Sequence, residues 1–174
     1  MDVVSSRRIY DGKVVNLRVD TLRGRNGATH DAEIVEHAEA VAVIVRPSPH
    51  EMLLVHQYRH PLGRKNWEVV AGGMNPGETP EEAAVRELRE ETGYRAHRVE
   101  RLWSAFPAPG FCEELLHFCV VHGYEIGEPE PDEGEEIELG VFTLDALWRK
   151  VRADELPDAK TQVSVLWALT ERGS

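Results

Sequence analysis

The stretch from Gly72 to Tyr94 constrains this chain more than any other, because it carries the start and stop signals of one helix. Thr79 is a favourable N-cap, Pro80 suits the first helical position, and Glu82 lies three residues after Thr79, as a capping box requires. Gly93 supplies the left-handed residue that commonly ends a helix. These signals predict a helix of about three turns that begins at Pro80 and ends just before Gly93.

The predicted helix carries one acidic face, because Glu87, Glu90 and Glu91 lie at positions i, i+3 and i+4 and repel one another. A solvated acidic face is the ordinary explanation for such a pattern. A divalent cation explains it better here, since hard ions such as Mg²⁺ take carboxylate oxygens together with water and substrate phosphates. Arg86, four residues before Glu90, can hold that carboxylate in place without occupying the metal. The apolar positions that can face a core are Ala83, Ala84 and Leu88.

The stretch resembles the signature of the Nudix hydrolases, Gly-x5-Glu-x7-Arg-Glu-U-x-Glu-Glu-x-Gly-U, where U is a bulky apolar residue. The residues that fill its defined positions are Gly72, Glu78, Arg86, Glu87, Leu88, Glu90, Glu91, Gly93 and Tyr94. Nine matches within 23 residues are far more specific than a lone glycine motif. The resemblance implies an α/β fold of the Nudix type, an α/β/α sandwich with a mixed sheet between helical layers.

The same resemblance implies a metal site and its ligands. Glu87, Glu90 and Glu91 would bind one or more Mg²⁺ ions, with Mn²⁺ as a substitute, and the backbone carbonyl of Ala71 would add a ligand. Arg86 would be a catalytic residue that supports these carboxylates. Glu78 lies in the preceding loop and suits a structural role, pairing with Arg86 or with backbone amides.

Phosphoanhydride hydrolysis also needs a group that orients the attacking water. An acidic loop offers Asp132, Glu133, Glu135 and Glu136, and solvation explains most of them. The similar ADP-ribose pyrophosphatases place a glutamate in this loop, two residues before an apolar position that opens the next strand. Glu135, before Ile137, matches best and Glu136 is the second choice. Either role, base or additional metal ligand, fits Glu135.

A proline about 15 residues beyond the signature marks the ADP-ribose pyrophosphatase branch of the Nudix family, and Pro109 lies at that distance from Tyr94. The usual sequence there in that branch is Ser-Pro-Gly-Phe-x-x-Glu. In this chain Ala108 replaces the serine, and Glu113 or Glu114 supplies the acid. A plain Pro-Gly turn explains the same residues and is compatible with binding. The substrate contacts that the resemblance implies in this segment are Pro109, Gly110, Phe111 and Glu114.

The resemblance implies further substrate residues outside this segment. Arg59 occupies the position of a phosphate-contacting arginine in similar enzymes, although an exposed arginine is more often only solvated. Glu68, before Val-Ala-Gly, also resembles this branch, where the acid can face the substrate pocket. The resembling family builds its adenine site partly from the partner's N-terminal strands, and the weak candidates for it are Arg8, Tyr10 and Arg18.

Periodicity and turn residues predict the other elements. The predicted strands cover residues 8–10, 13–22, 32–37, 40–46, 51–58, 67–71, 96–104, 115–123 and 138–142, with a loop at 58–66. Two more helices are expected over residues 143–152 and 158–172. The apolar stripe expected on the last helix consists of Val163, Val165, Leu166 and Leu169. We divide the chain into residues 1–38, an N-terminal β-meander expected to dimerise, and residues 39–174, the Nudix hydrolase domain.

Composition narrows the partners and the compartment. Twenty basic and 31 acidic residues give a net charge of −11, which disfavours binding to nucleic acid or anionic membrane. The two cysteines, Cys112 and Cys119, have neither metal nor disulfide spacing and suit small residues in or near a strand. We see no signal-peptide core and no apolar run of about 18 residues, so the expected location is cytoplasmic.

The resulting hypothesis is a homodimeric enzyme that hydrolyses the pyrophosphate bond of ADP-ribose, or of a related ADP-sugar, to AMP and a sugar phosphate. The same chemistry on another nucleoside diphosphate derivative, such as GDP-mannose, NADH or FAD, is the alternative. A non-catalytic nucleotide-binding Nudix domain would usually have lost a signature carboxylate, and none is lost here. Dimerisation is expected because the N-terminal strands leave edges that a two-fold partner can cover, unless the meander packs on its own sheet.

Overall fold

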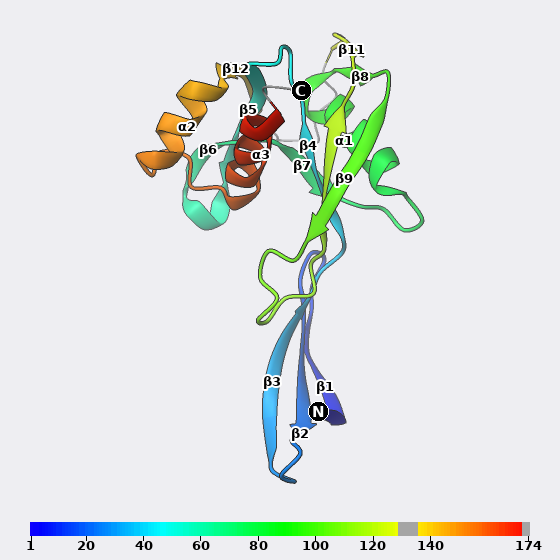
Figure 1. Ribbon diagram of the computed structural model, residues 1–174. Helices are drawn as coiled ribbons and strands as arrows, with labels where there is room; N and C mark the ends of the chain where they lie inside the picture. Colours follow the sequence, from blue (N-terminus) through cyan, green and yellow to red (C-terminus); the bar gives the residue numbers. More distant parts are fainter. Residues whose placement is uncertain (129–135, 172–174) are drawn as a thin grey trace. The chain divides into compact units, whose positions relative to one another are not determined.

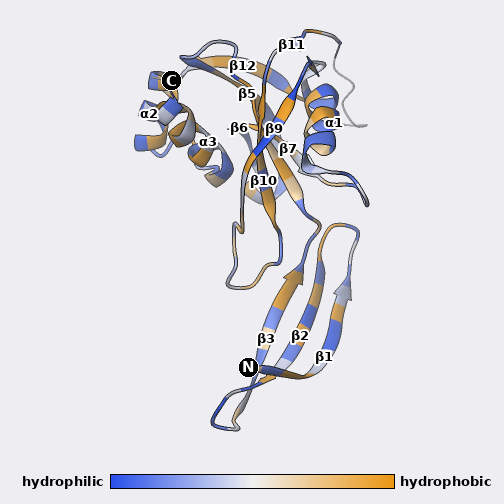
Figure 2. Cartoon of the chain, turned by 45° about the vertical axis from the view of Figure 1, so that its right-hand side comes forward, coloured by the Kyte–Doolittle hydropathy of each residue, from blue (hydrophilic) through white to orange (hydrophobic). Residues whose placement is uncertain are grey.

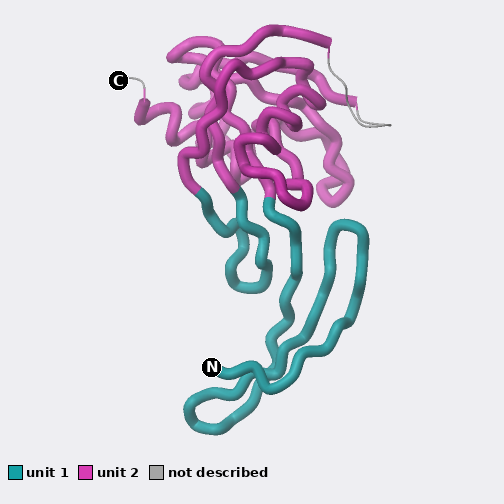
Figure 3. Tube along the Cα trace, turned by 90° about the vertical axis from the view of Figure 1, so that its right-hand side faces the viewer, with its two compact units in different colours: residues 1–39, 104–116 teal, residues 40–103, 117–174 magenta. Residues whose placement is uncertain are grey.

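The computed structural model describes residues 1–128 and 136–171, and it forms two compact units (Figures 1 and 3). Residues 1–39 and 104–116 make up the first unit, drawn in teal in Figure 3. Residues 40–103 and 117–174 make up the second. No helix in the described ranges is long and apolar enough to cross a membrane.

The first unit contains the predicted N-terminal meander, an antiparallel sheet of order β1-β2-β3. Its strands are β1 (Asp2–Asp11), β2 (Asn16–Arg23) and β3 (Thr29–Glu36). A single parallel bridge joins Val35 to Cys112, and the Val35 amide donates to the Phe111 carbonyl at 2.7 Å. The loop that contains Pro109 is therefore fastened to β3.

The second unit holds the remaining strands in separate sheets, except for the last two residues of β9 and the first of β10. Its strands are β4 (Ala40–Ile44), β5 (Glu51–Arg59), β6 (Arg64–Glu68), β7 (Val70–Gly73), β8 (Arg95–Ala96), β9 (Val99–Ala105), β10 (Leu116–Val121), β11 (Tyr124–Glu125) and β12 (Glu138–Thr143). The sheet orders are β7-β4-β10-β9, β12-β5-β6 and β11-β8. The second unit therefore has a four-stranded sheet beside a three-stranded one, with β4 leading into β5.

The helices of the second unit are α1 (Pro80–Thr92), α2 (Leu144–Arg152) and α3 (Ala159–Thr170). Figures 1 and 2 show α1 on one side of these strands and the pair α2 and α3 on the other, which confirms the expected α/β/α arrangement. Each helix begins at a side-chain cap: Thr79, Thr143 and Asp158 each accept a backbone N–H of the first turn.

The buried core joins α1 to both larger sheets. The strand β4 is buried along its whole length, as its continuous apolar run predicts. The core cluster contains Val41, Val43, Val45, Leu53, Val55, Val70, Ala83, Ala84, Leu88, Cys119 and Val121. Ala83, Ala84 and Leu88 face the core as predicted, and Glu91, one turn beyond Leu88, is buried beside them.

Several element boundaries differ from those predicted. The strand expected over residues 67–71 is divided at Val69, because β6 pairs with β5 whereas β7 pairs with β4. The expected loop at 58–66 contains a 3₁₀ turn, His60–Leu62, and the start of β6. The strand expected over residues 96–104 is likewise divided into β8 and β9.

The apolar stripe predicted for α3 is partly wrong. Val165 is buried, but Val163 and Leu166 are exposed. The buried positions of this helix are Thr161, Ser164, Val165 and Ala168. Small and polar residues face inward at the start of α3 because they form hydrogen bonds there, which an apolar period cannot reveal.

Candidate active site

Arg86 gathers the carboxylates of the acidic face of α1. Its Nη1 donates to Glu87 Oε1 at 2.6 Å and to Glu90 Oε2 at 3.1 Å. Its Nε and Nη2 donate to the two oxygens of Glu78 at 2.8 and 2.9 Å. Nη2 also reaches the carbonyl of Gly73 at 2.8 Å. The guanidinium therefore ties α1 to the end of β7, and the pairing of Arg86 with Glu90 and Glu78 is as predicted.

Glu78 is fixed by more than Arg86. The backbone amide of Asn75 donates to Glu78 Oε2 at 2.8 Å, and the Asn75 side-chain amide donates to Oε1 at 3.2 Å. The hydrogen bonds from Arg86, followed by those from Asn75, lower the pKa of Glu78 to about 2. The same hydrogen bond from Arg86 to Glu78 raises the pKa of the guanidinium further. Glu78 thus remains ionised and anchors the loop before α1.

Gly72 leaves room for the carboxylate of Glu87. A Cβ atom on Gly72 would lie 2.1 Å from Cδ of Glu87, a distance that a real side chain cannot occupy. Glu87 therefore lies directly against the backbone of β7, one residue after Ala71. A bulkier residue at position 72 would push this carboxylate away from the strand end.

Two of the predicted metal ligands, Glu87 and Glu90, already bind one positive charge together. One positively charged nitrogen of Arg86 already bonds to both Glu87 and Glu90, so these two carboxylates converge. Glu91 follows on the same face and is buried. Within the described residues, however, no group of three or more His, Cys, Asp or Glu side chains is arranged to hold a metal ion. The ligand set Ala71, Glu87, Glu90 and Glu91 therefore stays a prediction.

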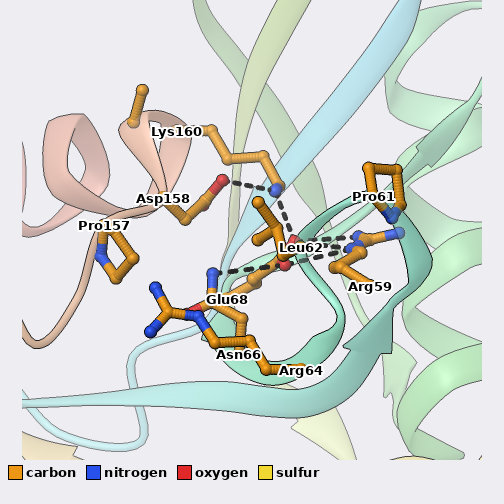
Figure 4. A pocket seen from close by; sticks show the side chains of 10 residues that line it. Arg59, Pro61, Leu62, Arg64, Asn66, Glu68, Pro157, Asp158 and Lys160 are labelled. Atoms are coloured by element: carbon orange, nitrogen blue, oxygen red, sulfur yellow. Dashed lines mark hydrogen bonds and ion pairs between the residues drawn. The ribbon is translucent and has the colours of Figure 1, made fainter.

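Arg59 and Glu68 meet in a pocket of about 380 Å³ (Figure 4). Arg59 Nε donates to Glu68 Oε1 at 3.0 Å, and Arg59 Nη2 donates to Oε2 at 2.8 Å. Only 3% of the Glu68 side chain is exposed, against 37% of Arg59. The structure therefore brings together two residues that the sequence suggests separately.

Two residues of this pocket, Lys160 and Asp158, were not predicted as site residues from the sequence. Lys160 Nζ donates to Glu68 Oε2 at 2.5 Å and to Asp158 Oδ1 at 2.8 Å. Asp158 is recognisable in the sequence as a helix cap, but the pairing of Lys160 with Glu68 spans 92 residues. The signal that could have found it is the need of a buried carboxylate for a second cation.

Electrostatics keeps this cluster charged. Burial by itself raises the pKa of Glu68, but the hydrogen bonds from Arg59, together with the charge and hydrogen bond of Lys160, outweigh it and lower the pKa overall. The hydrogen bond to Glu68 raises the pKa of Arg59, and the more distant charge of Glu91 adds to that rise. Arg59 is therefore a permanent cation within the field of the acidic face of α1.

The predicted substrate residues of the proline loop belong to the first unit. The Phe111 amide and the Cys112 amide both donate to the Ala108 carbonyl, which makes the Pro109–Gly110 segment a turn. The ring of Phe111 is exposed, and Glu114 Oε1 lies 3.8 Å from His37 Nδ1. Their role in substrate binding stays a prediction.

The acidic-loop candidates are only partly described. Glu135, the first choice for the base, lies outside the described residues. Glu136 is exposed and is followed by Ile137, which packs against the core cluster. An apolar anchor therefore opens this strand, as the sequence predicts, and the choice between Glu135 and Glu136 stays open.

The weak adenine candidates lie in the first unit. Arg18 pairs with Glu36 at 2.5 Å and with Glu113 at 2.6 Å, and these hydrogen bonds raise the pKa of the guanidinium. Arg8 also pairs with Glu36. Tyr10 is exposed on β1. Arg18 thus links β2 to β3 and to the residue after Cys112.

The chain resembles known proteins in both sequence and structure. The NUDIX domain family model matches residues 36–163. The chain is 38% identical over 164 residues to the methanol dehydrogenase activator of Bacillus methanolicus, with 93% of this chain and 89% of the relative covered. It is 35% identical to the ADP-ribose pyrophosphatase of Bacillus subtilis, with the same shares covered. The crystal structure of an ADP compounds hydrolase shares the fold, with a TM-score of 0.85, 22% identity and coverage of 98% of this chain and 92% of that one.

Proposed function

This chain belongs to the NUDIX family of hydrolases, and from that premise we propose that it hydrolyses the pyrophosphate bond of ADP-ribose and related ADP-sugars. The products are AMP and a sugar phosphate. The observation that carries the proposal is the acidic face of α1, where Arg86 bonds to both Glu87 and Glu90 and Glu87 lies against Gly72. The near full-length similarity to an ADP-ribose pyrophosphatase supports the choice of substrate.

Mg²⁺ is the metal that we propose for this site, held by Glu87, Glu90, Glu91 and the Ala71 carbonyl. A bound Mg²⁺ supplies neutralisation of the phosphate charge and a more acidic bound water. Arg86 keeps two of the carboxylates facing each other, and Glu78 fixes Arg86 in turn. This ordering lowers the cost of bringing like charges together in the absence of substrate.

Arg59 is the residue that we propose for contact with a substrate phosphate, with Glu68 orienting it. A guanidinium offers paired N–H donors to a phosphate, and its charge persists at any working pH. Pro109, Gly110, Phe111 and Glu114 stay proposed substrate contacts on the basis of the resemblance to the ADP-ribose pyrophosphatase branch.

Glu135 is the proposed general base, and Glu136 is the second choice. A base acts in the transition state, so Glu135→Gln should lower kcat much more than it weakens substrate binding. Steady-state kinetics on Glu135→Gln and Glu136→Gln separate the two residues. A large loss of kcat in Glu136→Gln alone would reverse the assignment.

We also propose a homodimer formed through residues 1–38, with residues 39–174 as the hydrolase domain. The support is the exposed outer strand β1, whose side chains include the apolar Val3, Val4 and Ile9. A cytoplasmic location, without nucleic acid or membrane as a partner, is proposed from the acidic composition and the two free cysteines.

The test is a kinetic panel of ADP-ribose, ADP-glucose, GDP-mannose, NADH and FAD with Mg²⁺. We expect the highest kcat/KM on ADP-ribose or ADP-glucose, with AMP as a product. A preference for GDP-mannose, NADH or FAD would replace the proposed substrate but keep the chemistry. Nucleotide binding without turnover on any of the five would reject hydrolysis itself.

A further inference from the structure

We infer that Lys160 is a positioning residue for substrate binding: it shares the buried carboxylate of Glu68 and so leaves Arg59 available to an anionic ligand. The inference rests on the proposed function, since it concerns the same pocket. Lys160 comes from α3, far in sequence from both β5 and β6.

The geometry places two cations on one carboxylate. Figure 4 shows Arg59 and Lys160 reaching Glu68 from different elements, with the hydrogen bonds converging on its two oxygens. Asn66 Nδ2 adds a longer bond to Glu68 Oε1 at 3.4 Å. Glu68 therefore does not depend on Arg59 alone for compensation of its buried charge.

The guanidinium of Arg59 keeps donors for a ligand. Its bonds to Glu68 use Nε and Nη2, and Nη1 makes no hydrogen bond to any residue in the described part of the chain. Arg59, Arg64 and Lys160 line the pocket together with two carboxylates, those of Glu68 and Asp158. One net positive charge remains, which favours a phosphate in a protein that is acidic as a whole.

Lys160 is itself held in place. Its ammonium also bonds to Asp158, the cap of α3, and only 17% of its side chain is exposed. The next residue, Thr161, accepts the backbone N–H of Val69 at 2.9 Å. The start of α3 therefore contacts Glu68 and Val69, the residues that lead to Ala71. A lysine fixed in this way can set the charge of the pocket without touching the substrate.

The test compares Lys160→Met, which keeps the aliphatic stem, with Lys160→Arg, which keeps the charge. We expect Lys160→Met to raise the KM for ADP-ribose about tenfold, the effect of losing one nearby charge, while kcat changes much less. Lys160→Arg should recover most of the affinity. Lys150→Met is the matched control, because Lys150 of α2 pairs with Glu155, away from the pocket residues, and its loss should leave KM unchanged.

A purely structural role would give a different result. It would lower the melting temperature and the active fraction, and therefore the apparent kcat, with KM unchanged. That outcome, or an equal rise in KM for Lys150→Met, would overturn the inference.

A second measurement separates this inference from the proposed substrate. Calorimetric titration with inorganic pyrophosphate in metal-free buffer needs neither turnover nor ADP-ribose. We expect wild-type protein and Lys160→Arg to bind and Lys160→Met to bind about tenfold more weakly. If the enzyme prefers another nucleotide but this difference holds, only the choice of substrate fails. Equal binding by all three proteins, or absence of binding by the wild type, overturns the role of Lys160.

Discussion

Arg86 bonds to three carboxylates, and two of these three, Glu87 and Glu90, are predicted metal ligands. The third, Glu78, holds the arginine from the loop before the helix. The positive charge of Arg86, fixed by Glu78, explains why Glu87 and Glu90 can lie on adjacent turns of α1. The arginine offsets their repulsion, and Glu78 and the Gly73 carbonyl hold it in addition to the residues that would bind the metal.

Removing one predicted ligand should stop turnover but not folding. We expect Glu90→Gln or Glu91→Gln to lower kcat by more than about 100-fold. Mutation of residues that only support metal ligands already costs about 10- to 100-fold, and loss of a ligand itself should cost more. The melting temperature should stay equal or rise slightly, because neutral glutamine relieves repulsion on the helix. Glu81→Gln, on the first turn of α1, is the control. Wild-type turnover of both ligand variants at saturating Mg²⁺ would refute the metal assignment.

The depressed pKa of Glu78 makes a prediction about acid stability. The carboxyl titrates at about 2 in the folded protein and near 4.5 when unfolded, so its contribution is fully present above pH 4.5. It is lost as the pH falls toward 2. We expect Glu78→Gln to lower the free energy of unfolding by about 1–2 kcal/mol at pH 7, after allowance for solvent screening.

Urea unfolding of wild type and Glu78→Gln from pH 7 to pH 3 measures this difference. It should be constant down to about pH 5 and shrink below pH 4.5. A difference that grows on acidification would mean that the pair with Arg86 does not stabilise the fold.

At the scale of elements, local signals decided what could be predicted. The helix α1 matches its predicted bounds because its N-cap, capping box and left-handed Gly93 are all local. The strand β1 was underestimated, since both of its faces are exposed and its residues therefore lack a hydrophobic alternation. The division at Val69 was missed for a different reason. Only the pairing with two different neighbours, β5 and β4, reveals that the chain changes sheets there.

Thr161 should matter because it stabilises that change of sheets. Its buried hydroxyl accepts the Val69 N–H, and it donates to Asp158 in turn. Thr161→Val keeps the shape but leaves the buried amide unsatisfied, so we expect a loss of about 1–3 kcal/mol in the free energy of unfolding. Thr170→Val, at the exposed end of the same helix, is the control. Equal stability of the two variants in urea would contradict this role.

At the scale of the molecule, the two parts of the candidate site differ in how far the sequence reveals them. The acidic face of α1 lies within 23 residues, and spacing alone places its carboxylates together. The cluster around Glu68 draws on β5, β6 and α3, and its link to Lys160 spans 92 residues. Such a pair follows from tertiary packing, which the spacing of residues in a single sequence does not specify. The link between Arg18 and Glu113 spans 95 residues and escaped prediction for the same reason.

The quaternary prediction depends on the outer strand of the meander. The strand β1 pairs on one edge with β2 and has no second neighbour in its sheet among the described residues. Such an edge exposes backbone donors and acceptors that a second copy can pair, and Ile9 and Val4 add apolar area. We therefore expect light scattering to give about 39 kDa at micromolar concentration, twice the monomer mass of 19.6 kDa.

Two substitutions on the meander test whether β1 forms the dimer. Ile9→Lys places a charge on β1 and should shift the mass toward 19.6 kDa while weakening ADP-ribose binding, if the partner contributes to the adenine site. Val14→Lys is the matched control, because Val14 is exposed in the turn between β1 and β2 rather than on the strand. Deletion of residues 1–38 should likewise abolish dimerisation. A wild-type mass near 19.6 kDa, or a deletion variant that remains fully active, would show that the meander serves the monomer alone and that no adenine site is shared between subunits.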